Sequence, residues 1–208
     1  MATYHASITD EQAELIRNAA LFFVATADPH LSAGPNGIGP VNLSPKGGVP
    51  LHILNPNRVA FLDYTGSGNE TARHVLAGGP ITVMICSFET ENAAIVRLYG
   101  KARVTPLADS SMTDVLLKSA PQEPKGPARQ VIEIEVEKTI TSCGYGVPVM
   151  AFVRNRRAGD RGRRYKDRST DHIRAQVQGE DRSNQRCSGP AGHAAASQAK
   201  RPQGLRLS

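Results

Sequence analysis

Short apolar runs separated by turn-forming residues make up most of the chain before residue 154. Runs rich in β-branched and aromatic residues predict strands at residues 21–27, 40–44, 50–54, 58–64, 81–88, 95–104 and 131–140. The last of these alternates strictly, with glutamates on one face and, on the other, Ile132, Ile134, Val136 and Lys138. We therefore expect that strand to be covered on one face only.

Turn residues separate these strands and predict how neighbouring strands connect. Gly and Pro residues break the chain between 28 and 39. Pro45-Lys46-Gly47-Gly48 lies between the strands at 40–44 and 50–54, which predicts a β-hairpin, and Asn55-Pro56-Asn57 marks the next turn.

Three short helices are predicted between the strands. Thr9 and Gln12 have the spacing of a capping box, which predicts a helix that ends near Ala20. Further helices are predicted at 69–77, with Asn69 as a capping residue, and at 109–119. Because strands and helices do not alternate regularly, the order indicates an antiparallel barrel of six or seven strands rather than a doubly wound sheet.

The pattern changes abruptly at Arg154, where Arg, Gly, Ser, Gln and Asp become dominant. No helical or strand period connects the few apolar residues beyond this point. The sequence therefore predicts a folded domain over residues 1–153 and a basic, disordered tail over residues 154–208.

The formal net charge of +6 comes entirely from the tail. Residues 1–153 hold 11 Lys and Arg against 14 Asp and Glu, whereas residues 154–208 hold 14 against 5. The tail has one aromatic residue, Tyr165, and no amphipathic period. We expect a solvated extension, with no specific nucleic-acid partner and no membrane partner.

Cysteine and histidine spacing argues against a disulfide framework and against a metal site. Cys86, Cys143 and Cys187 are odd in number and lack Cys-x-x-Cys spacing, and the six histidines lack metal-ligand spacing. The N-terminus does not resemble a signal peptide, and no apolar run is long enough to cross a membrane, so we expect a cytoplasmic protein.

Two segments combine residues suited to an anionic ligand. Residues 41–47 (VNLSPKG) place a hydroxyl and an ammonium two positions apart on a strand, beside a glycine. Residues 63–71 (DYTGSGNET) combine a strand end, a turn with two glycines and a helix start, which would offer free backbone N–H groups. Either segment alone is also typical of an ordinary capped turn, and neither matches the P-loop or dinucleotide-binding pattern.

Five segments together carry a resemblance to a known family: FFVATA at 22–27, VNLSPKG at 41–47, NRVAFLDYTGSGNETARH at 57–74, RLYGKARV at 97–104 and TSCGYGVP at 141–148. In these segments the chain resembles the pyridoxamine 5′-phosphate oxidase-related family of FMN-binding split-barrel proteins, over residues 8–153. The resemblance implies a mainly β fold, a six-stranded antiparallel split β-barrel with short inserted helices. It also implies a homodimer that holds FMN in two clefts formed by both subunits.

The resemblance assigns FMN-binding roles to individual residues. Ser44 and Lys46 would face the flavin and its phosphate, while a second group of residues would hold the phosphate in the following turn, namely Thr65, Gly66, Ser67 and Asn69. Asn42 and Arg97 complete the expected set, although an arginine on a half-exposed strand also suits a solvated surface position. Cys143 is interpreted as a small buried residue without a catalytic role.

The function implied is that of an FMN-dependent oxidoreductase that transfers a hydride from a small-molecule substrate to the flavin, a chemistry that asks little of protein side chains. The alternatives are a flavin- or haem-binding split-barrel protein without turnover, and a protein that binds a deazaflavin. Pyridoxamine phosphate oxidases carry a C-terminal segment with a tryptophan, and this chain has no tryptophan. Since no helical pattern follows residue 153, we hypothesise that an altered reading frame or splice choice produced the tail.

Overall fold

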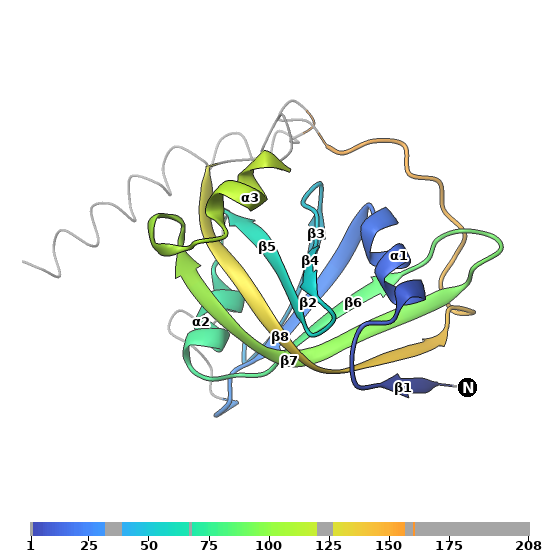
Figure 1. Ribbon diagram of the computed structural model, residues 1–208, viewed down its shortest axis with the longest axis horizontal. Coiled ribbons are helices and arrows are strands. Elements are labelled where there is room, and N and C mark those ends of the chain that lie inside the picture. The colour runs from blue at the N-terminus through green and yellow to red at the C-terminus, as the bar shows by residue number, and fades with distance from the viewer. Residues whose placement is uncertain (1, 32–38, 67, 120–126, 157–159, 161–208) are drawn as a thin grey trace, which may run out of the picture. The chain divides into compact units, whose positions relative to one another are not determined.

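The computed structural model describes residues 2–31, 39–66, 68–119, 127–156 and 160. In the N-terminal half the elements are β1 (Thr3–His5), α1 (Asp10–Asn18), β2 (Leu21–Ala27), β3 (Val41–Gly47), β4 (His52–Asn55), β5 (Arg58–Tyr64) and α2 (Glu70–Leu76). They are followed by β6 (Ile81–Cys86), β7 (Ala94–Pro106), the 3₁₀ helix η2 (Leu107–Asp109), α3 (Thr113–Lys118) and β8 (Ala128–Cys143). Figure 1 labels the α-helices and the strands.

The strands form a single antiparallel sheet of eight strands within the described residues. Its order is β3-β2-β6-β7-β8-β5-β4, with β1 added alongside β8. The mainly β, antiparallel class with short inserted helices is thus confirmed. The sheet has more strands than the six expected, partly because the three-residue β1 lacks any apolar run that would reveal it in the sequence.

The predicted hairpin between residues 40–44 and 50–54 is wrong. β3 does not end at Ser44 but continues to Gly47, and it pairs with β2 along its whole length, from Val41 opposite Ala27 to Gly47 opposite Leu21. β4 pairs instead with β5, at the other edge of the sheet. Pro45 is tolerated within β3 because an edge strand has a side on which no backbone N–H is needed.

The sheet curls around an apolar core that reaches both faces of β5. Val59 and Phe61 of β5 lie in the main cluster with Ile132 and Ile134 of β8. A second cluster, on the other face of β5, contains Ala60, Leu62 and Val131, and Leu116 of α3 covers it. This double coverage explains why residues 58–64 read as a nearly continuous apolar run.

The predicted alternation in β8 holds from Ile132 to Val136, but the expected one-sided cover is wrong at Val131, which is buried in the second cluster on the other face. Ile132, Ile134 and Val136 are buried as expected, but Lys138 is exposed and Thr139 is buried instead. The cause is a shift in pairing with β7, in which Tyr99 lies opposite Lys138 while Gly100 lies opposite Val136. Such a β-bulge reverses the facing of every later residue in the strand.

The helix predictions are confirmed in position but not in every detail. The Thr9 side chain accepts a hydrogen bond from the Gln12 backbone, and the Gln12 side chain accepts one from the Thr9 backbone, so the capping box is present. Asn69 occupies the N-cap position of α2, but its side chain does not cap the helix. The third helix begins at Thr113, later than predicted, because a 3₁₀ turn occupies residues 107–109.

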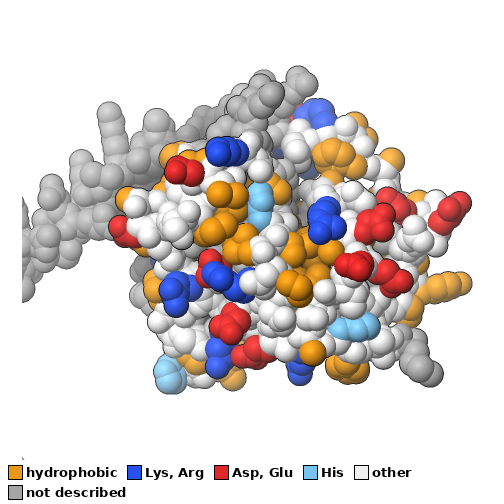
Figure 2. All heavy atoms as spheres, viewed as in Figure 1, with side chains coloured by type: hydrophobic (Ala, Val, Ile, Leu, Met, Phe, Trp, Pro, Cys, Tyr) orange, Lys and Arg blue, Asp and Glu red, His pale blue; other side chains and the backbone are white. Residues whose placement is uncertain are grey.

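The chain divides into two units, residues 1–158 and 159–208. Of the second, only Asp160 is described, so the predicted disordered tail, with Tyr165 and Cys187, lies outside the described residues. None of the described helices has the length and apolar character needed to span a bilayer. Figure 2 shows acidic and basic side chains interspersed on one face of the molecule.

Candidate functional site

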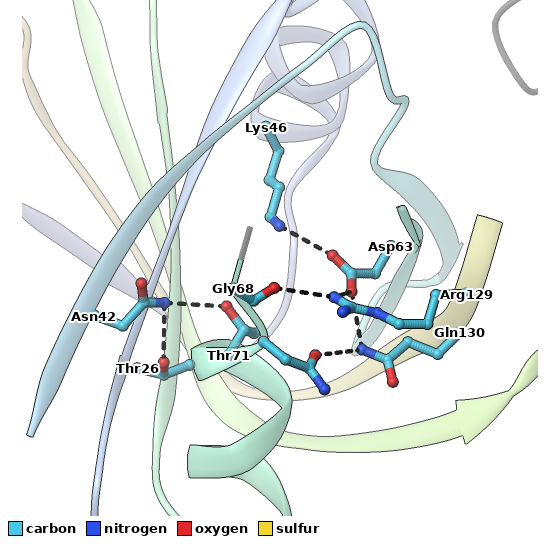
Figure 3. Close-up of polar contacts among 9 residues, drawn as sticks. Thr26, Asn42, Lys46, Asp63, Gly68, Thr71, Arg129 and Gln130 are labelled. Atoms are coloured by element: carbon cyan, nitrogen blue, oxygen red, sulfur yellow. Dashed lines mark hydrogen bonds and ion pairs between the residues drawn. The ribbon is translucent and has the colours of Figure 1, made fainter. Parts of the chain in front are cut away.

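A buried carboxylate between two cations forms the centre of the candidate site (Figure 3). Lys46 Nζ lies 3.1 Å from Asp63 Oδ1, and Arg129 Nη2 lies 2.6 Å from Asp63 Oδ2. The Asp63 side chain is 6% exposed, whereas those of Lys46 and Arg129 are 20% and 27% exposed. The three side chains together carry one net positive charge that is partly accessible to solvent.

Three separate strands deliver these side chains. Lys46 of β3 pairs with Phe22 of β2, and its ammonium lies 5.8 Å from the centre of the Phe61 ring in the core. Asp63 is the second-last residue of β5, and it lies two residues after Phe61 on the same face of the strand. The ion pair between β3 and β5 therefore spans the interior of the curled sheet, because these strands lie towards opposite ends of the strand order.

A β-bulge brings Arg129 to the same carboxylate as its neighbour Gln130. Asp63 pairs with Gln130 and Tyr64 pairs with Ala128, which leaves Arg129 as the extra residue of β8. Consecutive residues of a regular strand point to opposite faces, but here Arg129 Nη2 and Gln130 Nε2 both donate to Asp63 Oδ2. The bulge thus concentrates donors at one point.

These donors determine the ionisation of Asp63. Burial by itself would raise the pKa of this carboxyl group, but the hydrogen bond from Arg129 and the charge of Lys46 act in the opposite direction, together with the hydrogen bonds from Gln130 and Lys46. The net result is a pKa below the ordinary value of 3.8. Asp63 is therefore an anion at neutral pH, and it neutralises one of the two cations.

Gln130 and Arg129 also fix the turn that leads into α2. Gln130 Nε2 donates to the side-chain oxygen of Asn69 at 3.0 Å, and Arg129 Nη2 donates to the Gly68 carbonyl at 3.4 Å. The bond from Gln130 explains why Asn69 does not cap α2 with its own side chain. The turn is thereby tied to the cationic cluster.

A second polar network holds α2 against β2 and β3. Asn42 Nδ2 donates to Thr71 Oγ1 at 3.0 Å and lies 3.4 Å from Thr26 Oγ1. Thr26 Oγ1 in turn lies 3.0 Å from His74 Nδ1, and Thr26, Thr71 and His74 are all buried. Figure 3 shows Asn42, Thr26 and Thr71 beside the cationic cluster. The network attaches the helix that follows the turn to the strand that carries Lys46.

Three buried polar atoms have no hydrogen-bond partner within the described part of the chain: Ser44 Oγ, Arg129 Nε and Tyr64 Oη. Buried polar groups are normally satisfied, so each such atom calls for an explanation. Ser44 lies on the same face of β3 as Asn42 and Lys46, and Arg129 belongs to the cluster itself. Tyr64 packs instead against the second apolar cluster, and burial raises the pKa of its hydroxyl.

The structure brings together only some of the predicted site residues. Asn42, Ser44 and Lys46 share one face of β3, and Asn69 joins them through Gln130. Thr65 and Gly66 are exposed, and Ser67 lies outside the described residues. The Thr65 backbone N–H donates to the Pro127 carbonyl at 3.0 Å, so it is not one of the free donors that the turn was expected to supply.

Arg97 lies apart from this cluster. Its neighbours Val96 and Leu98 are buried in the core, so Arg97 projects from the opposite face of β7, where Nη1 donates to Ser142 Oγ at 3.1 Å. Cys143 also differs from expectation, because it is exposed rather than buried. It is the last residue of β8, where the strand leaves the sheet.

No role was predicted for Arg129 or Gln130, and Asp63 was included only as the first residue of the segment 63–71. Asp63 was visible as a charged residue within an apolar strand, which is a signal for a paired buried charge. Arg129 and Gln130 gave no comparable signal, because their convergence depends on a bulge. Thr26, Thr71 and His74 likewise join the second network only through the packing of α2.

Comparisons with known proteins agree on one family. Residues 8–143 match the family model of pyridoxamine 5′-phosphate oxidase. The pyridoxamine 5′-phosphate oxidase family protein ustO from Aspergillus flavus is 33% identical over 153 residues, which cover 72% of this chain and 57% of that protein. The chain thus spans little more than half the length of this curated relative.

A solved structure supports the fold. A crystal structure of a HupZ variant from Group A Streptococcus is 23% identical, with a TM-score of 0.50, and the match covers 65% of this chain and 99% of that one. At this level of identity the likeness concerns the arrangement of the strands and not the chemistry of the site.

Proposed function

The chain belongs to the pyridoxamine 5′-phosphate oxidase family, and from this membership we propose that it is an FMN-dependent oxidoreductase acting on a small molecule. The observation that carries the proposal is the convergence of Lys46 and Arg129 beside the unpartnered hydroxyl of Ser44. When bound, the isoalloxazine ring would supply the acceptor for a hydride from the substrate.

The donors in the cluster fit a phosphate group. Lys46 uses only part of its donor capacity on Asp63, and Arg129 retains an unpartnered Nε. The Ser44 hydroxyl adds a neutral donor on the same face as Lys46. Charged donors bind phosphate strongly, while a hydroxyl adds direction, so these atoms would satisfy a phosphate and be satisfied by it.

Hydrogen bonds from the surrounding residues would fix the positions of the phosphate ligands. Gln130 holds both Asp63 and Asn69, so the turn at 65–69 and the cations would move together. Asn42 ties α2 to β3 through Thr71, which makes it a positioning residue rather than a direct ligand. Thr65 and Gly66, which are exposed, remain proposed contacts, as does Ser67, which lies outside the described residues.

A homodimer is part of the proposal. β3 is an edge strand, and its outward-facing Val41 and Leu43 are 65% and 64% exposed. Apolar side chains on an unpaired edge are a liability in a monomer, and a second copy of the chain would cover them. Size measurement by light scattering would test this part of the proposal independently of the flavin.

An absorption spectrum of the purified full-length protein, with mass identification of the released ligand, tests the cofactor. The flavin spectrum with FMN in the extract is expected, whereas a haem spectrum or a deazaflavin would contradict it. Anaerobic incubation with candidate electron donors then tests turnover. Bleaching of the flavin supports an oxidoreductase, and the absence of bleaching with any donor favours a flavin-binding protein without turnover.

Lys46→Met tests whether the cluster holds the cofactor. This change removes the ammonium but keeps most of the side-chain volume, so we expect FMN affinity to fall by about tenfold or more, as the loss of a charged hydrogen bond predicts. Lys101→Met is the matched control, because Lys101 is 81% exposed and forms only a long ion pair with Glu137. Equal FMN affinity in the two variants would contradict the assignment.

A further inference from the structure

Asp63 is an unexpected residue for a phosphate site, because it places a negative charge where a second anion would bind. Its two carboxylate oxygens accept from both cations and from Gln130, all at 3.1 Å or less. With Asp63 ionised, Lys46 and Arg129 together offer one net positive charge rather than two. The terminal phosphate of FMN carries between one and two negative charges at neutral pH, as phosphate monoesters do.

We propose that Asp63 is a built-in competitor for the phosphate of the flavin, which limits the affinity of the site for FMN and keeps the cofactor exchangeable. This inference rests on the proposed function. It follows from the geometry, since the carboxylate already occupies donors of Lys46, Arg129 and Gln130 that a phosphate would use. Asp63 is thus a residue that sets ligand specificity without contacting the reacting atoms.

Lys46, whose side chain is 20% exposed, is the donor that a phosphate can reach while Asp63 keeps its own bonds. Ser44 Oγ and Arg129 Nε are buried and would bind the phosphate only if the side chains around them moved. Phosphate and carboxylate would then share two cations, and their mutual repulsion would lower the affinity for any anionic flavin. A flavin without a phosphate would not experience this repulsion.

Asp63→Asn provides the direct test, because it removes the charge and nearly preserves the shape of the side chain. We expect the Kd for FMN to fall by about tenfold, a change of about 1.4 kcal/mol, from the loss of a like charge within a few ångströms. The Kd for riboflavin should stay within about twofold, since riboflavin lacks the phosphate. Both constants are obtained by fluorescence titration of the full-length protein.

Glu133→Gln is the matched control for net charge. Glu133 forms an ion pair with Arg58 at 2.7 Å, at the opposite end of β5 from Asp63, and the substitution changes the charge of the protein by the same amount. Its Kd values for FMN and riboflavin should equal those of the wild type. A general electrostatic effect would instead tighten FMN binding in both variants and overturn the assignment to Asp63.

Asp63→Ser gives a second measurement if the asparagine variant fails to fold, because it removes the charge and leaves space for the phosphate. Unchanged or weaker FMN binding in the folded variants would overturn the inference, since it would mean that Asp63 chiefly orients the two cations. Loss of folding in both variants would also count against it, because Asp63 would then be a structural residue. If wild-type protein binds FMN no better than riboflavin, the proposed phosphate site itself fails.

Discussion

At Asp63 a single carboxylate holds together three side chains from two strands. Lys46, Arg129 and Gln130 all donate to it, and its 6% exposure means that it is largely removed from water. Breaking a buried ion pair by removing one partner typically costs about 3–5 kcal/mol, because the remaining charge stays buried and unpaired. The cations here keep 20% and 27% exposure, which lowers that cost.

The first prediction concerns acid stability. The pKa of Asp63 in the folded chain lies below its ordinary value of 3.8, so the ionised form stabilises the fold at every pH above that value. This contribution is lost as the pH falls below 3.8 through the pKa of the folded state. Denaturant titrations from about pH 5 down to about pH 2 should show this loss in the wild type, because it develops below 3.8.

Asp63→Asn is expected to lack this part of the acid dependence, because it has no carboxyl group to protonate at this position. Glu133→Gln should retain it, because Asp63 is intact in that variant and Glu133 pairs with Arg58 instead. Parallel stability curves for the wild type and Asp63→Asn over the whole acid range would contradict the assigned cause.

Individual residues show where sequence reasoning succeeds and where it stops. Ser44 and Lys46 could be predicted on one strand face, because alternation along a strand is a local rule. The partners of Lys46 are distant in the chain, and the Arg129 contact also depends on an extra residue in β8. Neither a long-range contact nor a bulge is encoded in a local pattern of apolar and polar residues.

Two β-bulges in β8 determine which way its side chains face. The bulge at Arg129 directs consecutive side chains to the site, and the bulge at Glu137 reverses the facing of the last part of the strand. The sequence predicted β5 with its exact limits and the core of β8, because both have clear apolar patterns. The prediction that β3 pairs with β4 is wrong, because it assumed that strands adjacent in the chain are also adjacent in the sheet.

The second prediction concerns Gly100, which lies at the bulge between β7 and β8. A Cβ atom at this position would overlap the carbonyl oxygen of Glu135, and a backbone atom in a paired strand cannot move aside easily. Gly100→Ala is therefore expected to lower the free energy of unfolding by about 2–4 kcal/mol in denaturant titrations.

Gly146→Ala is the control, because a Cβ at Gly146 would meet no atom within 4 Å. This variant should stay within about 0.5 kcal/mol of the wild type, as surface substitutions usually do. A Gly100→Ala variant as stable as Gly146→Ala would show that the two strands separate more easily at the bulge than the described pairing implies.

The curl of the whole sheet creates the candidate site. Lys46 and Asp63 come from strands near opposite ends of the strand order, and the apolar core between the strands brings them within 3.1 Å. The fold class followed from the sequence because the number and spacing of apolar runs fit an antiparallel barrel. Which strands meet across the interior depends on the curvature of the whole sheet, which stays open between its edge strands β3 and β4.

The third prediction concerns residues 159–208, of which the structure describes only Asp160. Residues 1–158 form one unit and contain the candidate site with both apolar clusters. A chain that ends at Ala158 is expected to keep the melting temperature and FMN affinity of the full-length protein. A clearly lower melting temperature or weaker FMN binding would show that residues 159–208 contribute to the fold or to the site.

The proposed function requires the phosphate of FMN to bind at Lys46 and Arg129. A crystal structure of the full-length protein with FMN would locate this phosphate. We expect its oxygens within hydrogen-bonding distance, about 2.7–3.2 Å, of Lys46 Nζ, Ser44 Oγ and Arg129 Nε. A phosphate bound elsewhere, with none of these three atoms in contact with it, would refute the proposed site.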